Sequence, residues 1–158
     1  MNRCVKRFLA LAVATVAASA VLPASSSGAA GGVRIEANFL PGLFLDQSHE
    51  QAVVNEVPDL RSPEWYLQDR PEGQFAIVNE RSGKCLARPF LGGDGDAQLR
   101  DCRGDERSQA WDIVTNGYRT VAFREGEQCL TYPGAEDVPV TVTRCAGRTE
   151  QQWLLRNP

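Results

Sequence analysis

Short apolar runs separated by glycine, proline and charged residues recur along this chain from residue 33 onward. In the stretch 74–115, the runs 74–79, 84–87, 97–101 and 110–115 have the length of β-strands, with turn residues between them. Apolar residues at helical spacing are absent from this part of the chain. The pattern predicts an all-β protein of short strands, built as a sandwich or a closed barrel.

The same order of four runs occurs twice more. The third set is 118–124, 128–132, 140–144 and 153–156, and the fainter first set is 33–39, 43–46, 52–56 and 65–68. A tryptophan marks the last run of each set, at Trp65, Trp111 and Trp153, with spacings of 46 and 42 positions. Units of this length cannot bury an apolar face alone. We therefore expect repeats at about 33–68, 74–115 and 117–156 to share one core that contains the three tryptophans.

The first thirty residues have the order of a secretory signal peptide. Basic residues (Arg3, Lys6, Arg7) precede an apolar run over 8–22 and a small-residue segment over 24–32. The apolar run is shorter than the roughly 20 residues of a membrane helix, and no stop-transfer pattern follows it. We predict a cleaved signal peptide over 1–30, a secreted domain over 31–158, and no membrane association after cleavage.

Removal of this segment makes the protein acidic. Lys plus Arg falls from 17 to 14 against 20 acidic residues, a formal charge of −6. No Lys/Arg-rich block with interleaved aromatic residues occurs in the remainder. Both observations argue against nucleic acid as a partner.

Four cysteines remain after cleavage: Cys85, Cys102, Cys129 and Cys145. An even number in an exported chain indicates disulfides, and the repeat favours one bridge inside each of the last two repeats. The separations of 17 and 16 residues do not suit zinc ligation, which requires cysteines two to four residues apart. In the first repeat, Phe44 and Val57 occupy the cysteine positions, and we expect an apolar contact between them.

The motifs Ser82-Gly83-Lys84-Cys85-Leu86, Gln98-Leu99-Arg100-Asp101-Cys102 and Gln109-Ala110-Trp111 together resemble the ricin B-type β-trefoil lectin family. Cys129-Leu130, Cys145 and Gln151-Gln152-Trp153 repeat the pattern, while the first copy has Pro63-Glu64-Trp65. The resemblance covers about 33–155. It implies a pseudo-threefold β-trefoil of three four-strand repeats, with a six-stranded barrel closed at one end by three hairpins, and it implies carbohydrate binding.

In sugar-binding repeats of that family, a carboxylate follows the Cys-Leu strand, an aromatic residue precedes the second cysteine, and a polar residue precedes the Gln-x-Trp glutamine. The carboxylate and the aromatic residue are missing from the second and third repeats, and neither has the asparagine usual before the glutamine in galactose-binding members. The residues at these positions are Ala87, Arg100 and Ser108 in one repeat and Thr131, Thr143 and Glu150 in the other. We therefore expect a degenerate sugar site.

The first repeat keeps half of the family's site. Asp46 stands at the carboxylate position, Asn55 at the stacking position, and His49 follows nearby. We predict Asp46, Asn55 and His49 as ligand-binding residues, against the alternative that Asp46 is an exposed turn carboxylate. Phe90 and Tyr132 are possible replacement stacking residues, although loop packing is the simpler explanation for both.

Catalysis is not expected. The chain has one histidine, its remaining cysteines are assigned to bridges, and the paired acidic residues lie in Gly/Pro-rich loops. We expect no enzyme, no cofactor and no metal. Two hypotheses remain: a secreted lectin-like module that binds an extracellular glycan, or a protein-binding trefoil such as a protease inhibitor or surface-interaction protein, which would dock through loops 90–96 or 132–138.

Overall fold

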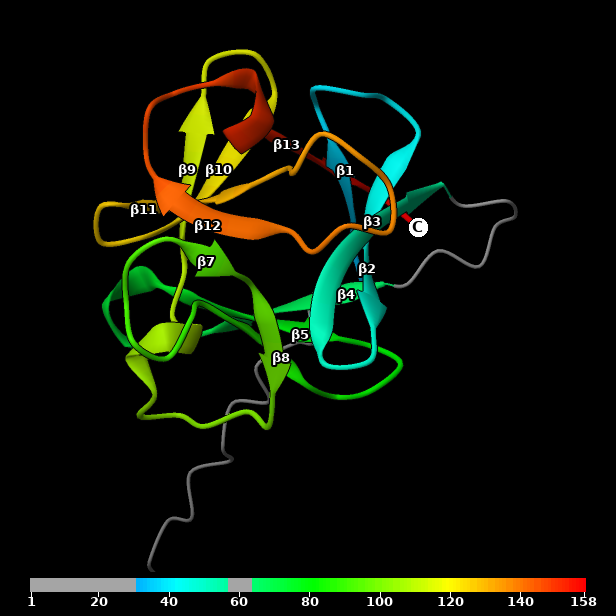
Figure 1. Cartoon of the computed structure of the whole chain (residues 1–158). Helices are drawn as coiled ribbons and strands as arrows, with labels where there is room; N and C mark the ends of the chain where they lie inside the picture. The colour runs from blue at the N-terminus through cyan, green and yellow to red at the C-terminus, as the bar shows by residue number, and fades with distance from the viewer. Residues whose placement is uncertain (1–30, 57–63) are drawn as a thin grey trace, which may run out of the picture.

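The computed structural model describes residues 31–56 and 64–158, and the regular secondary structure in these ranges is almost entirely β-strand (Figure 1). The first repeat contains β1 (Arg34–Ala37), β2 (Leu43–Ser48), β3 (Gln51–Glu56) and β4 (Trp65–Asp69). The second contains β5 (Phe75–Asn79), β6 (Cys85–Ala87), β8 (Gln98–Arg100) and β9 (Asp112–Asn116). The third contains β10 (Thr120–Glu125), β11 (Gln128–Thr131), β12 (Thr141–Arg144) and β13 (Trp153–Arg156). The twelve predicted strands are confirmed, with ends displaced by at most two residues.

Four further elements were not predicted. Strand β7 (Gly95–Asp96) is defined by its pairing with β12 of the third repeat, so no local sequence pattern predicts it. Three single-turn 3-10 helices are η1 (Pro71–Gly73), η2 (Arg107–Gln109) and η3 (Thr149–Gln151). Helices this short leave no amphipathic period in the sequence. The predicted signal peptide, 1–30, lies outside the described residues and stays a prediction.

Six strands close into a barrel. β1 pairs with β13, β4 with β5, β9 with β10, and β10 with β13. The remaining links are made at the tryptophans: Val33 pairs with Trp65, and Phe75 pairs with Trp111. Because β1 joins the two ends of the described chain, the barrel closes only when the first repeat meets the third.

Three hairpins, β2–β3, β6–β8 and β11–β12, cap this barrel around a pseudo-threefold axis (Figure 1). Their second strands meet at fully buried residues, Ala52, Ala97 and Val140. Ala52 N donates to Ala97 O (3.2 Å), Ala97 N to Val140 O (2.7 Å), and Val140 N to Ala52 O (2.7 Å). This ring of backbone hydrogen bonds joins the three repeats.

The core draws side chains from all three repeats, and its buried members are at most 7 % exposed. One layer consists of the three tryptophans, and each indole N–H donates to the carbonyl of the leucine at the equivalent place in its own repeat. These bonds are Trp65 Nε1 to Leu45 O (3.0 Å), Trp111 Nε1 to Leu86 O (2.9 Å) and Trp153 Nε1 to Leu130 O (3.1 Å). The tryptophans are therefore confirmed as core residues in all three repeats. Their one polar atom is satisfied inside the barrel.

The glutamine of each Gln-x-Trp motif holds the loop that carries the second cysteine. Gln109 donates to Asp101 O (2.9 Å) and accepts from Arg103 N (2.9 Å), on the two sides of Cys102. Gln151 makes the equivalent bonds to Arg144 O (2.9 Å) and Ala146 N (2.7 Å), around Cys145. Both glutamines are buried, and these bonds fix the loops that carry the second cysteines.

Both predicted disulfides are confirmed, Cys85–Cys102 and Cys129–Cys145. The proposed contact of Phe44 with Val57 falls partly outside the described residues. The register nevertheless agrees with the alignment, because Phe44 lies opposite Asn55 just as Cys85 lies opposite Arg100, two residues before the second cysteine. Within the described ranges, no helix has the length and apolarity that a membrane span requires.

Glu36 is a buried carboxylate at the junction of the first and last strands. It accepts hydrogen bonds from Gly42 N (2.8 Å) and from Arg156 Nε (2.5 Å), and its side chain is 8 % exposed. We expect Glu36→Ala to lower the free energy of unfolding by about 2 kcal/mol, because hydrogen bonds to a charged group are lost and their donors stay partly buried. Urea denaturation measures this change.

The matched control is Glu50→Ala. The Glu50 side chain is 81 % exposed and pairs with Lys84 Nζ at 3.2 Å, so its removal should cost less than about 1 kcal/mol. Equal destabilisation by the two substitutions would contradict a special role of Glu36 in closing the barrel.

Candidate functional site

The structure brings together two of the three predicted ligand residues. Asp46 and Asn55 lie on the β2–β3 hairpin, and Asn55 Nδ2 donates to Asp46 Oδ2 (3.2 Å). His49 is in the exposed turn of this hairpin, at a φ of 56°, and its ring Nδ1 lies 3.4 Å from Ser48 Oγ. No hydrogen bond between His49 and Asp46 is present.

Asp46 already has several partners. Its Oδ1 accepts from Gln47 N (2.6 Å) and lies 3.9 Å from Arg81 Nη1 of the second repeat. The turn that carries Arg81 is well defined, because Asn79 Oδ1 accepts from Ser82 N (3.1 Å) and Gly83 takes a φ of 66°. A sugar hydroxyl at Asp46 would have to share or displace these contacts. The roles of Asp46, Asn55 and His49 in binding stay predictions.

A pocket of about 250 Å³ lies in the third repeat, at the place equivalent to Asp46 and Asn55 of the first repeat. Its lining comes from β11 and the following loop, from β12, from η3 and from the loop after β1: Phe39, Thr131, Tyr132, Pro133, Gly134, Thr143, Arg148, Glu150 and Gln151. Thr131, Thr143 and Glu150 hold the three positions at which the family places its sugar ligands. The pocket therefore coincides with these three positions.

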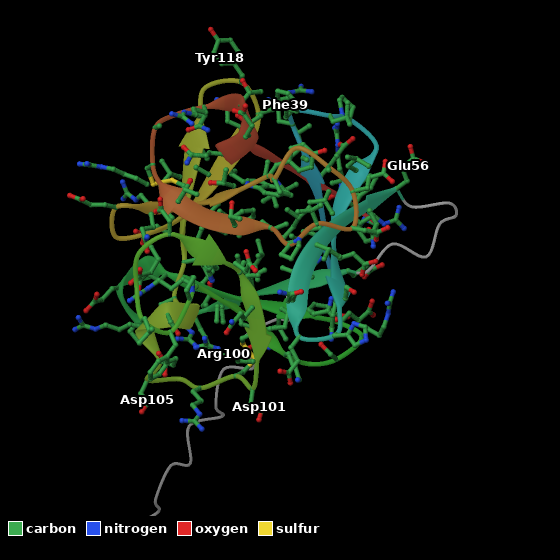
Figure 2. All side chains as sticks on the ribbon, viewed as in Figure 1. Phe39, Glu56, Arg100, Asp101, Asp105 and Tyr118 are labelled. Atoms are coloured by element: carbon green, nitrogen blue, oxygen red, sulfur yellow. A yellow bond between two sulfur atoms is a disulfide. The ribbon has the colours of Figure 1, made fainter. Side chains whose placement is uncertain are left out.

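Phe39 reaches this pocket from the first repeat. β1 pairs with β13. Beyond this pairing, Asn38 donates two hydrogen bonds to Gln152, from N to the backbone O (3.0 Å) and from Nδ2 to Oε1 (3.3 Å). The Phe39 ring, 49 % exposed, lies 5.9 Å from the buried ring of Tyr132, at an interplanar angle of 36°. The pocket thus gains an aromatic wall that the third repeat lacks in its own stacking position, and Figure 2 shows Phe39 beside the third repeat.

The hydroxyls on the pocket floor form one network. Thr131 Oγ1 lies 2.8 Å from Thr143 Oγ1, and Gln151 Nε2 lies 3.2 Å from both oxygens. Thr131 Oγ1 also lies 2.9 Å from Cys129 O, to which it can donate. The pocket floor is therefore polar and preorganised, because the hydroxyl oxygens of both threonines already have hydrogen-bond partners within the protein.

Charged groups at the rim remain available. The side chains of Glu150 and Arg148 make no hydrogen bond or ion pair with any residue that the structure describes. The Glu150 backbone carbonyl accepts from Tyr132 N (2.8 Å), which holds this residue at the rim. Burial, with a smaller contribution from Glu136, raises the pKa of Tyr132, so its phenol is neutral at physiological pH.

A second pocket, of about 340 Å³, lies at the equivalent place in the second repeat. It is lined by Phe90, Arg100, Asp101, Arg103, Glu106 and Gln109. Phe90 is 76 % exposed and the guanidinium of Arg100 lies over its ring, 5.7 Å from the centroid. Asp46 lines neither of these two pockets.

Sequence reasoning missed Phe39, Arg148 and Glu150 as possible site residues. Glu150 could have been found, because it carries a carboxylate at a family ligand position; Phe39 could not, because its contact spans the first and third repeats. Among the described residues, no three His, Cys, Asp or Glu side chains are gathered in a way that would hold a metal ion.

A model of the ricin-type β-trefoil lectin domain matches residues 73–158, which is more than half of the chain. No curated protein matches the sequence significantly.

Solved structures with the same fold include the designed threefold-symmetric protein ThreeFoil, 20 % identical, which covers 82 % of this chain and 100 % of its own, with a TM-score of 0.66. A ricin B-like lectin of Macrolepiota procera in complex with lactose is 12 % identical, with coverages of 84 % and 100 % and a TM-score of 0.69. The Polyporus squamosus lectin bound to a sialylated epitope is 16 % identical, with coverages of 84 % and 50 % and a TM-score of 0.68. The three closed repeats, their tryptophan layer and the matching family model together place this chain in the ricin-type β-trefoil lectin domain family.

Proposed function

We propose that this protein is a secreted carbohydrate-binding module, without catalytic activity, that binds an extracellular glycan in the pocket of its third repeat. The observation that carries the proposal is the aromatic wall of Phe39 beside two charged side chains, Glu150 and Arg148, that have no described partner. The signal-like segment at 1–30 and the two disulfides support secretion.

The chemistry of the pocket suits an uncharged sugar. A carboxylate accepts hydrogen bonds from two neighbouring sugar hydroxyls, and a guanidinium donates to ring or hydroxyl oxygens. The apolar C–H face of a pyranose requires a flat apolar partner, which the half-exposed Phe39 ring offers. The volume of about 250 Å³ is suited to one or two sugar units rather than a long buried chain.

A glycan array probed with the protein lacking residues 1–30, followed by titration of the best ligand, tests the proposal. Because related lectins were solved with lactose and with a sialylated galactoside, galactosides belong in the array beside xylans and chitin oligosaccharides. We expect Glu150→Gln to weaken binding about tenfold, which corresponds to about 1.4 kcal/mol for the loss of charge-assisted hydrogen bonds. Phe39→Ala should weaken it by a similar factor.

Glu127→Gln is the matched control. The Glu127 side chain is 86 % exposed, belongs to the same repeat and does not line the pocket, so this variant should bind like the original protein. Loss of binding in Asp46→Asn together with normal binding in Glu150→Gln would contradict the third-repeat site and place binding at the first repeat.

One observation favours the protein-binding alternative. Phe90 and Leu91, at the tip of the loop before β7, are 76 % and 93 % exposed, which is unusual for adjacent large apolar residues. No binding to any glycan on the array would overturn the carbohydrate proposal and favour this alternative.

A further inference from the structure

We propose that the second repeat carries a separate binding site for a carboxylate-bearing sugar, such as a uronic or sialic acid residue, with Arg100 as the group that holds the carboxylate. The inference rests on the proposed function, because it extends glycan binding to a second pocket. In the family pattern Arg100 occupies the stacking position, and a cation there changes which ligand the pocket can recognise.

Arg100 is held in one orientation before any ligand arrives. Its Nε (3.0 Å) and Nη2 (2.5 Å) both donate to Gln98 Oε1, while its guanidinium rests over the Phe90 ring. Of the five N–H donors of an arginine, three therefore have no partner among the residues that the structure describes. A preoriented planar guanidinium is the side chain best suited to hold a carboxylate.

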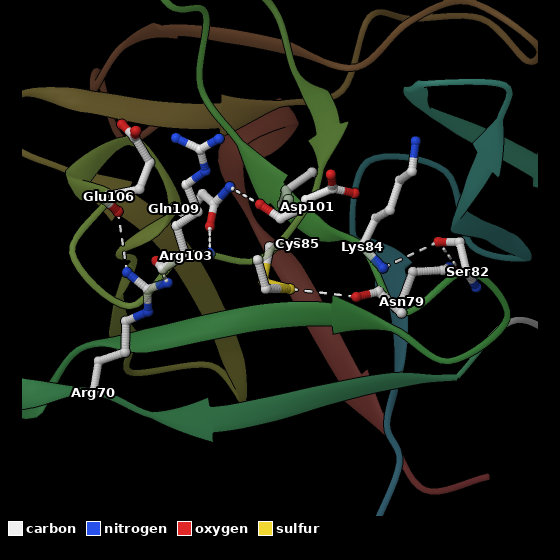
Figure 3. The surroundings of a disulfide bond; sticks show 12 residues. Arg70, Asn79, Ser82, Lys84, Cys85, Asp101, Arg103, Glu106 and Gln109 are labelled. Carbon is white, nitrogen blue, oxygen red and sulfur yellow. Dashed lines mark hydrogen bonds between the residues drawn. A yellow bond between two sulfur atoms is a disulfide. The ribbon is translucent and has the colours of Figure 1, made fainter.

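The loop on the opposite side of the pocket is also fixed. Arg70 extends across from the residue before η1 and donates through Nη1 to Glu106 O (3.0 Å) and through Nη2 to Arg103 O (2.5 Å), and Figure 3 shows the bond to Glu106. Gln109 holds the backbone on both sides of Cys102 through hydrogen bonds to Asp101 O and Arg103 N. Neither wall has to be ordered when a ligand binds, so little conformational entropy is lost.

Two of the four charged residues that line this pocket are arginines, although the whole protein is acidic. Arg100 and Arg103 line this pocket together with the carboxylates of Asp101 and Glu106, while the Arg70 guanidinium is held by backbone carbonyls outside it. The Glu106 carboxylate already accepts from Ser108 Oγ (2.8 Å), and Arg103 has no side-chain partner among the described residues. In Figure 3 the Asp101 carboxylate points away from Glu106 and Gln109. The remaining N–H groups of Arg100 and the Arg103 guanidinium are therefore available to an anionic group, while the Glu106 carboxylate is already hydrogen-bonded.

Phe90 supplies the second part of the recognition. It is 76 % exposed, so the part of the ring that Arg100 leaves uncovered can contact the C–H face of the sugar that bears the carboxylate. A neutral sugar would satisfy this contact but would offer the oriented guanidinium only hydroxyl oxygens, which form weaker hydrogen bonds than a carboxylate does. The pair Arg100 and Phe90 thus predicts a preference for the acidic member of two otherwise identical sugars.

The decisive comparison uses the disulfide-bonded protein lacking residues 1–30, titrated with methyl glucuronide and with methyl glucoside, which differ only in the carboxylate. We expect at least a tenfold preference for the glucuronide, decreasing as salt concentration increases. Arg100→Gln should remove the preference, and Arg100→Lys, which keeps the charge without the planar fork, should retain only part of it. A methyl sialoside titrated in parallel separates uronic from sialic acid as the source of the carboxylate.

Arg119→Gln is the matched control, because it removes the same charge from an exposed turn next to Tyr118, which Figure 2 places at the other end of the molecule from Arg100. Equal affinity for the two glycosides, or a preference that survives Arg100→Gln in a variant with normal thermal unfolding, would overturn the second site. If neutral glycans still bind and depend on Glu150, only the second site fails. If no sugar binds at all, the proposed function fails with it.

Discussion

Replacing Trp111 with alanine is expected to lower the free energy of unfolding by about 3–5 kcal/mol, the range for removal of a large buried aromatic side chain. The indole is completely buried, and its N–H satisfies Leu86 O at 2.9 Å. Its backbone also makes both hydrogen bonds that join β5 to the end of the second repeat, through Phe75. The substitution therefore leaves a cavity and an unsatisfied carbonyl at a link of the barrel.

Urea denaturation of the protein lacking residues 1–30, followed by far-UV circular dichroism, measures this loss. Trp111→Phe should cost less, because most of the ring volume stays and mainly the bond to Leu86 is removed. Tyr118→Ala removes an aromatic side chain that is 90 % exposed, and we expect a change within about 0.5 kcal/mol. A Trp111→Ala protein with an unchanged unfolding midpoint but no glycan binding would show that the tryptophan serves the ligand rather than the core.

Removing the Cys85–Cys102 bridge by a double substitution to alanine is expected to cost about 3–4 kcal/mol. A closed loop of 17 residues restricts the unfolded chain by about 3 kcal/mol in the chain-entropy model. Cys85 is also completely buried and packs against Ala76 and Val78, with Tyr66 beside them, so the loss of sulfur contacts adds to the cost. The loop bearing Cys102 should become the first part of the second repeat to exchange its amide hydrogens.

The double substitution of Cys129 and Cys145 provides the comparison, because its loop of 16 residues should contribute nearly the same free energy. Differential scanning calorimetry of both variants, and of the original protein with and without a reducing agent, separates the two bridges. An unchanged unfolding temperature after complete reduction would contradict a stabilising role. Unequal losses beyond about 1 kcal/mol would indicate that the repeats are not energetically equivalent.

Strand positions could be predicted closely because they depend on short-range signals. The turn at 81–83 and the apolar runs on its two sides define β5 and β6 locally, and a tryptophan repeated at nearly constant spacing marks a shared core. The disulfide pairing followed from the same repetition. In contrast, β7 arises from pairing with a strand about 45 residues further along the chain, and no local pattern contains that information.

The candidate site was predictable only in part. Asp46 and Asn55 do meet, as the alignment with the family indicated, but the guanidinium of Arg81 beside Asp46 comes from another repeat and was not foreseen. In the third repeat the ligand positions hold Thr131 and Thr143, so the family pattern predicts no sugar site there. The aromatic wall of its pocket is supplied by Phe39, more than 90 residues away.

The three-repeat all-β architecture, the buried tryptophans and the two bridges could be predicted from the sequence, because periodic burial and cysteine spacing are properties of the chain read one unit at a time. The way in which the repeats complete one another follows only from their packing. β1 closes the barrel by pairing with β13, and this pairing places Phe39 in the same pocket as Glu150. The Gln98 side chain holds the Arg100 guanidinium over the Phe90 ring. The pockets depend on distances between side chains from separate elements, and only the packed barrel sets those distances.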